Sequence, residues 1–114
     1  MRMWMVDPKK MCSAHLRGEY VELFMFLGTF KKKKKISGYI NNNLVEPLAI
    51  PERFEALKQE MLSRGFNAKK PFNFSREILN YLPNDQIHHK INREKALQDL
   101  LQRCPKCKTL HQVA

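Results

Sequence analysis

Apolar residues recur with helical spacing along the first long segment of the chain. One continuous helical face is formed by residues spaced four, three and four positions apart, namely Leu16, Tyr20, Leu23 and Leu27. Asp7 can cap a helix and Pro8 suits its first position, so we predict a helix that runs from Pro8 to about Phe30. Its C-terminal half should be enclosed on nearly all sides, since the other faces also carry apolar residues, namely Val21, Phe24 and Met25.

Residues that typically cap or break helices predict where the later helices begin and end. Pro51 opens a second helix, which Gly65 ends. Ser75 caps a short helix, which Pro83 ends, and Asn92 caps a last helix with an apolar face of its own.

The segments between these helices carry loop signals, and no segment alternates as a strand would. The lysine run 31–35 and the asparagines 41–43 predict a loop after the first helix. The chain contains no internal repeat. The sequence therefore predicts an all-α fold: one compact domain, residues 1–114, of about three principal helices joined by long loops.

The charge balance is strongly basic. The chain has 21 Lys and Arg against 11 Asp and Glu, a net charge of +10. Such a charge favours polyanionic partners, through phosphate contacts and the release of counterions. The clearest basic cluster consists of Lys31, Lys32, Lys33, Lys34 and Lys35. It is either a solvated loop or a phosphate-binding segment, and the sequence leaves both open.

Three further features concern the location of the protein. The opening residues lack the apolar core and cleavage site of a signal peptide. The apolar run around Leu23 is too short for a bilayer and contains an acid. An odd count of three cysteines argues against a secreted disulfide scaffold. We expect an intracellular, cytoplasmic monomer with no membrane partner.

Glu22 interrupts the apolar run, and on its own such a carboxylate indicates an ion pair at the edge of the core. Two stretches suggest a different role. The start "MR…HLRGEYVEL" and the later "LSRGFN", residues 62–67, resemble the pyrimidine-dimer DNA glycosylases typified by a small bacteriophage enzyme. The opening "MRMWMVDPKKMC" is closer still to bacterial members of that family. The resemblance covers residues 1–30 and about 50–67.

The resemblance implies a DNA-repair N-glycosylase with abasic-site β-lyase activity on damaged double-stranded DNA. It implies that the α-amine of Met1 is the nucleophile and that Glu22 is the indispensable acid. Arg2 corresponds to a DNA-contacting residue, and His15 to a histidine that lines the site. For His15 a structural role is equally compatible with the sequence, and Glu19 is expected to be structural, as a buttress for a backbone or basic group.

An α-amine suits the chemistry that the family implies. A neutral amine must attack C1′ of deoxyribose to form an imine. A lysine side chain, with a reference pKa of about 10.4, is nearly all protonated at neutral pH, whereas an α-amine at about 7.7–8.0 leaves a usable neutral fraction. Removal of an initiator methionine requires a small second residue, so Arg2 should keep Met1 in place. Imine formation requires no cofactor and no catalytic metal.

The chain departs from the family at several positions. Val21 and Met25 stand where the phage enzyme has arginines beside its glutamate. The phosphate contacts of those arginines are then lost or made by other basic residues. The candidates are Lys31–Lys35, Arg17, Arg64 and the pair Lys69 and Lys70. The aromatic-rich tail of the phage enzyme is absent. Cyclobutane pyrimidine dimers are implied as the lesion, and a broader or different damaged base stays open.

The last segment contains Cys104-Pro-Lys-Cys107, the spacing of half a zinc site. Two reduced thiols at the end of a helix are the interpretation that we favour from sequence. The alternative is a structural zinc completed by Cys12 and one histidine, for which His15, His88, His89 and His111 are available. A Cys12-x-x-His15 pair facing Cys104-x-x-Cys107 would withdraw His15 from an active site.

Two other functions compete with the repair enzyme. One is a non-catalytic basic nucleic-acid-binding module, with or without a zinc staple, that holds DNA or RNA through Lys31–Lys35. The other is an abasic-site lyase whose base specificity has drifted.

Overall fold

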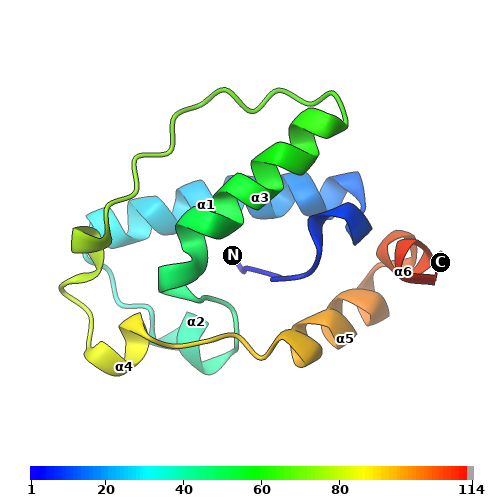
Figure 1. Ribbon diagram of the computed structural model, residues 1–114. Coiled ribbons are helices and arrows are strands. Elements are labelled where there is room, and N and C mark those ends of the chain that lie inside the picture. Colours follow the sequence, from blue (N-terminus) through cyan, green and yellow to red (C-terminus); the bar gives the residue numbers. More distant parts are fainter. Residues whose placement is uncertain (113–114) are drawn as a thin grey trace.

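The computed structural model describes residues 1–112, which form six α-helices and three 3-10 helices (Figure 1). The α-helices are α1 (Ser13–Lys31), α2 (Ser37–Asn41), α3 (Ile50–Ser63), α4 (Asn84–Ile87), α5 (Arg93–Arg103) and α6 (Pro105–Gln112). The 3-10 helices are η1 (Pro8–Lys10), η2 (Pro47–Ala49) and η3 (Arg76–Leu79). These residues contain no strand, which confirms the all-α prediction, and α1, α3 and α5 are its three principal helices. None of the described helices has the length and apolar character that a membrane crossing requires.

The first helix begins five residues later than the sequence predicted. Asp7 does act as a cap, since its side chain accepts a hydrogen bond from the backbone N–H of Lys9 (3.0 Å), but it caps only η1. Met11 then adopts an extended backbone and buries its side chain completely. Cys12, also extended, is the N-cap of α1. Asp7 is therefore a helix cap, as predicted. The extended and buried Met11 ends η1, however, so that α1 begins separately at Ser13.

The caps of the later helices agree better with the sequence. Gly65 ends α3 with a φ of +86°, and the N–H of Phe66 donates to the carbonyl of Met61 (2.9 Å), as in a Schellman motif. The side chain of Asn92 caps α5 by accepting from the backbone of Lys95 (3.0 Å). The helix predicted after Ser75 is only the 3-10 helix η3. The short helices α2, α4 and α6 were not predicted.

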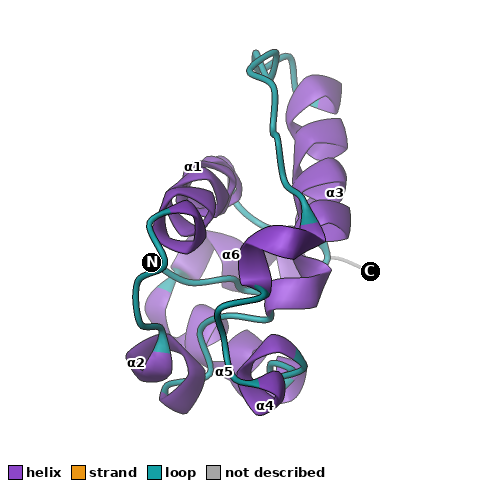
Figure 2. Cartoon of the chain, turned by 90° about the vertical axis from the view of Figure 1, so that its left-hand side faces the viewer, coloured by secondary structure: helices purple, strands orange, loops and turns teal. Residues whose placement is uncertain are grey.

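Two groups of helices enclose an extended N-terminal segment, residues 1–7. Figure 2 shows α1 and α3 on one side of this segment and α2, α4 and α5 on the other. Met3, Trp4 and Val6 of the segment are buried in the same core as α1 and α3. The start of the chain is thus an internal element of the fold.

One face of α1 remains open to solvent, contrary to the expected enclosure. Val21 and Met25 are 55 % and 51 % exposed, although both are apolar. They follow one another at a spacing of four residues, so they share a face that α3 does not cover. The apolar run therefore mixes core residues with a bare outer face.

The carboxylate that α1 buries is Glu19. The guanidinium of Arg53 on α3 binds it with two hydrogen bonds, Nε to Oε2 at 2.5 Å and Nη2 to Oε1 at 2.9 Å. The Nη1 atom of Arg53 also donates to the carbonyl of Val6 (2.6 Å). Both residues are buried, Glu19 with 1 % and Arg53 with 7 % exposure. Glu19 is therefore structural, as predicted, and its ion pair joins α1, α3 and the N-terminal segment.

We expect Arg53→Met to lower the free energy of unfolding by about 3–5 kcal/mol, because it leaves the carboxylate of Glu19 buried without a partner. The double variant with Glu19→Met should lose less than either single variant, since both charges are then removed. Urea unfolding measures all three. Arg76→Met, at an exposed position, is the control and should change the value by less than about 0.5 kcal/mol. Equal losses for Arg53→Met and Arg76→Met would contradict the assigned role.

Candidate active site

The α-amine of Met1 lies 3.8 Å from Oε1 of Glu22. The side chain of Met1 is 12 % exposed and that of Glu22 is 30 % exposed. Glu22 projects from the middle of α1, one turn after the buried Glu19. The fold thus brings the first residue and the second carboxylate of the helix together, at a place that solvent can reach.

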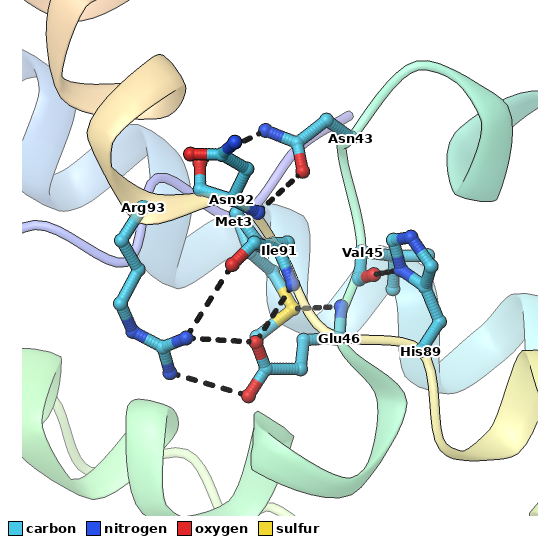
Figure 3. A network of polar contacts seen from close by, with 8 residues as sticks. All are labelled: Met3, Asn43, Val45, Glu46, His89, Ile91, Asn92 and Arg93. Atoms are coloured by element: carbon cyan, nitrogen blue, oxygen red, sulfur yellow. Dashed lines mark hydrogen bonds and ion pairs between the residues drawn. The ribbon is translucent and has the colours of Figure 1, made fainter.

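A polar network holds the N-terminal segment in this position (Figure 3). The N–H of Met3 donates to the carbonyl of Leu44 (2.7 Å), and the N–H of Glu46 donates to Sδ of Met3 (3.3 Å). The carboxylate of Glu46 accepts from the backbone of Ile91 (2.9 Å) and from both Nη atoms of Arg93 (3.2 Å each). The same network pairs Asn43 with Asn92, and Val45 with His89. Residues from the last third of the chain therefore fix the position of the N-terminal segment.

Arg2 lies beside the amine in an unusual environment. Its guanidinium stacks on Trp4, with Cζ 3.7 Å from the ring centroid, and its Nη1 lies 3.8 Å from a carboxylate oxygen of Asp99 on α5. Burial lowers the pKa of Arg2, and Asp99 acts in the opposite direction. The Nε and Nη2 atoms are buried and have no hydrogen-bond partner among the described residues. Such donors are costly unless a ligand or water pairs with them.

These groups line an open cavity of about 1070 Å³. Its walls come from the N-terminal segment, from one face of α1, and from α2 and α5. The space beside Gly18 on this face of α1 is open, since no heavy atom lies within 4 Å of where a Cβ would be. No local sequence signal marked the cavity residues that come from α2, its C-cap and α5, which are Asn41, Asn42, Lys95, Asp99 and Arg103.

The predicted DNA-contacting residues are divided between two places. Arg2, His15 and Arg17 line the cavity. The lysines 31–35 do not; all five are exposed at the far end of α1. Lys31 lies nine residues beyond Glu22, or roughly 13 Å along the helix axis.

Arg64, considered as a phosphate contact from sequence, is already engaged. It pairs with Glu60 (2.8 Å) and donates to the carbonyl of Pro8 (3.0 Å). It is therefore part of the structure that holds η1 against α3.

His15 has a second environment besides the cavity. Its Nδ1 lies 3.2 Å from Sγ of Cys12 and 3.8 Å from Sγ of Cys107. Its ring also meets the edge of Trp4, with centroids 5.7 Å apart. All three cysteines are free and buried. The structure thus places His15 among the thiols, in the arrangement that the sequence offered as the less favoured alternative.

Taken together, the cavity offers an amine nucleophile, an adjacent carboxylate and cationic walls. An amine attacks an electrophilic carbon, and a neighbouring carboxylate moves protons and stabilises a cationic intermediate. Four basic side chains and the amine outnumber the three acidic ones in the lining, so the cavity favours an anionic ligand. The basic residues are Arg2, Arg17, Lys95 and Arg103, and the acidic ones are Glu19, Glu22 and Asp99.

Comparison with known proteins gives one match. A family model described as pyrimidine dimer DNA glycosylase matches residues 1–74. The matched range includes Met1, Arg2, His15 and Glu22, whereas α4, α5 and α6 lie beyond it. No curated protein and no solved structure matches the chain.

Proposed function

The chain belongs to the pyrimidine dimer DNA glycosylase family, and we propose that it excises a damaged pyrimidine from duplex DNA and then cuts the strand at the abasic site. The family establishes DNA-repair glycosylase chemistry; the lyase step and the residue roles are our proposal. The observation that carries it is the 3.8 Å distance between the amine of Met1 and the carboxylate of Glu22.

In the first step the neutral amine of Met1 attacks C1′ of the damaged nucleotide. A C–N bond forms as the glycosidic bond breaks, and the departing base takes the bonding electrons and a proton. The sugar ring then opens: the C1′–O4′ bond breaks, O4′ is protonated, and C1′ becomes a protonated imine. The α-amine suits this attack because it is partly neutral near pH 7.

Glu22 serves each stage from the same position. Its carboxylate stabilises the positive charge of the imine. This electrostatic stabilisation is stronger in a cavity that partly excludes water than in bulk solvent. It also relays the proton to O4′ during ring opening. In the lyase step a proton leaves C2′ and the protonated imine becomes an enamine. The C3′–O bond then breaks, the 3′ phosphate departs with its electrons, and a C2′–C3′ double bond forms in conjugation with the restored imine. Water then hydrolyses the imine and restores the amine.

The cavity supplies the DNA contacts near the reacting carbon. Arg2 lines the cavity beside the amine, and its guanidinium charge favours a phosphate next to the damaged nucleotide. Lys95 and Arg103 on α5 extend the cationic wall that Arg17 begins on α1. An enzyme that acts on C1′ must displace a nucleotide from the stack. The open cavity leaves space for that displaced nucleotide.

Borohydride trapping on a duplex with one abasic site tests the nucleophile and the acid together. The native chain should form a covalent adduct with DNA, because borohydride reduces an imine to a stable amine. We expect Glu22→Gln to slow trapping by roughly 10²–10⁴-fold, the usual loss for a proton-transferring group. One glycine added before Met1 should abolish it, since the amine moves by about 3.5 Å.

Glu55→Gln is the matched control, because Glu55 is exposed on α3 and does not line the cavity. It should trap at the native rate. Undiminished trapping by Glu22→Gln would defeat the assignment of the acid. Absence of any adduct from the native chain, with salt-sensitive binding retained, would instead identify a non-catalytic basic module.

The lesion is tested on ultraviolet-irradiated duplex that contains cyclobutane pyrimidine dimers. We expect strand cleavage at the dimers, blocked by Glu22→Gln, and none in undamaged duplex. Gel analysis of end-labelled DNA measures both. Cleavage of abasic-site DNA without cleavage at dimers would show a lyase with a drifted base specificity and would contradict the proposed substrate.

The lysine run tests how the duplex is held outside the cavity. Replacing all five of Lys31–Lys35 by glutamine should make binding of undamaged duplex less salt-dependent, because the slope of log K against log salt is about 0.9 per phosphate contact. Trapping at saturating DNA should stay unchanged. Replacement by five arginines keeps the charge and should keep the slope. An unchanged slope in the glutamine variant would show that the lysines form only a solvated loop.

A further inference from the structure

Four potential metal ligands lie together at the junction of α1 and α6. They are Sγ of Cys12, Nδ1 of His15, and Sγ of Cys104 and Cys107, and all four atoms lie within 4.8 Å of one another. The two pairs are separated by about 90 residues, and Cys104 and Cys107 lie beyond the range that the family model matches. We propose that this cluster binds one Zn²⁺ ion as a structural site.

The distances agree with a tetrahedral zinc site. With Zn–S bonds of about 2.3 Å and a Zn–N bond of about 2.0–2.1 Å, neighbouring ligand atoms are about 3.6–3.8 Å apart. Sγ of Cys12 lies 3.7 Å from Sγ of Cys104 and 3.2 Å from Nδ1 of His15. Sγ of Cys107 lies 3.8 Å from the same Nδ1. Two of these separations match the tetrahedral values and the third is a few tenths of an ångström shorter, so small side-chain movements would bring all four atoms to bonding distance of one ion.

The two pairs occupy equivalent places on their helices. Cys12 is the N-cap of α1 and His15 is its third residue. Cys104 directly precedes α6 and Cys107 is its third residue. The N-terminal ends of both helices, where the helix dipole is positive, thus lie at the cluster.

Backbone donors also point at the sulfurs. The N–H of Cys12 lies 3.2 Å from Sγ of Cys107, and the N–H of Cys107 lies 3.4 Å from Sγ of Cys104. Such hydrogen bonds orient metal ligands and offset their negative charge. Since the protein supplies four ligands, no coordination position is left for a substrate or for a catalytic water.

Docking of α6 provides an independent argument. The helix has eight residues; Cys107 is its only buried residue, and Leu110 is partly buried against the core. A helix this short is not stable alone, and these two side chains bury little apolar surface. Metal ligation would add to the docking of α6, because zinc binding stabilises the folded arrangement of its ligands. The ion would clamp α6 to the start of α1 and hold His15 against Trp4, beside the cavity.

Metal analysis of the native chain, purified with reductant and without chelator, tests the proposal. We expect one zinc ion per chain, measured by inductively coupled plasma mass spectrometry. Titration of the metal-free chain with Co²⁺ should give the thiolate-to-metal and d–d absorption bands of a tetrahedral site. Cys104→Ser and Cys107→Ser should lose both signals, and His15→Asn should weaken Co²⁺ binding by at least about tenfold.

His111→Gln is the matched control, because His111 lies on α6 but outside the cluster. It should keep full zinc content and the cobalt spectrum. If the serine variants fail to fold, zinc content and Co²⁺ titration of the native chain decide alone. Three titratable thiols with no zinc and no cobalt bands would overturn the proposal, as would a disulfide in the freshly purified chain. Neither readout depends on DNA cleavage.

Discussion

The buried ion pair between Glu19 and Arg53 is the constraint on which the rest of the structure depends. A charge removed from water is tolerated only when its partner and its remaining hydrogen bonds are in place. Arg53 meets this demand with Glu19 on one side and the carbonyl of Val6 on the other. The crossing of α1 and α3 and the path of the N-terminal segment are therefore fixed together. Glu22, one turn further along α1, faces the amine as a result.

The parts of the chain inside and outside the range that the family model matches contribute different parts of the site. Residues 1–74, which the model matches, carry the amine, Arg2 and Glu22. Beyond this range α5 forms a cavity wall, and Ile91 and Arg93 hold Glu46. The amine–carboxylate pair and the groups that support it are thus far apart in the sequence and joined only in space. The cavity around the pair is complete only when α5 is in place.

Much of the fold could be predicted from sequence, because caps and periodicity are local. Gly65 and Asn92 ended and began helices where their conformational preferences require. The start of α1 could not be predicted, because burial of Met11 is a tertiary effect that overrides the cap at Asp7. Val21 was misjudged for the same reason, since periodicity does not reveal which helical face lacks a neighbour.

Within the site, motif resemblance predicted the roles of Met1 and Glu22, whereas Lys95 and Arg103 carried no signal until α5 was placed. The network of Figure 3 also couples the stability of two distant segments. Met3 is held by Leu44 and Glu46, and Glu46 is held in turn by Ile91 and Arg93. Local unfolding around Ile91 should therefore loosen the N-terminal segment as well, so that the two segments open as one cooperative unit.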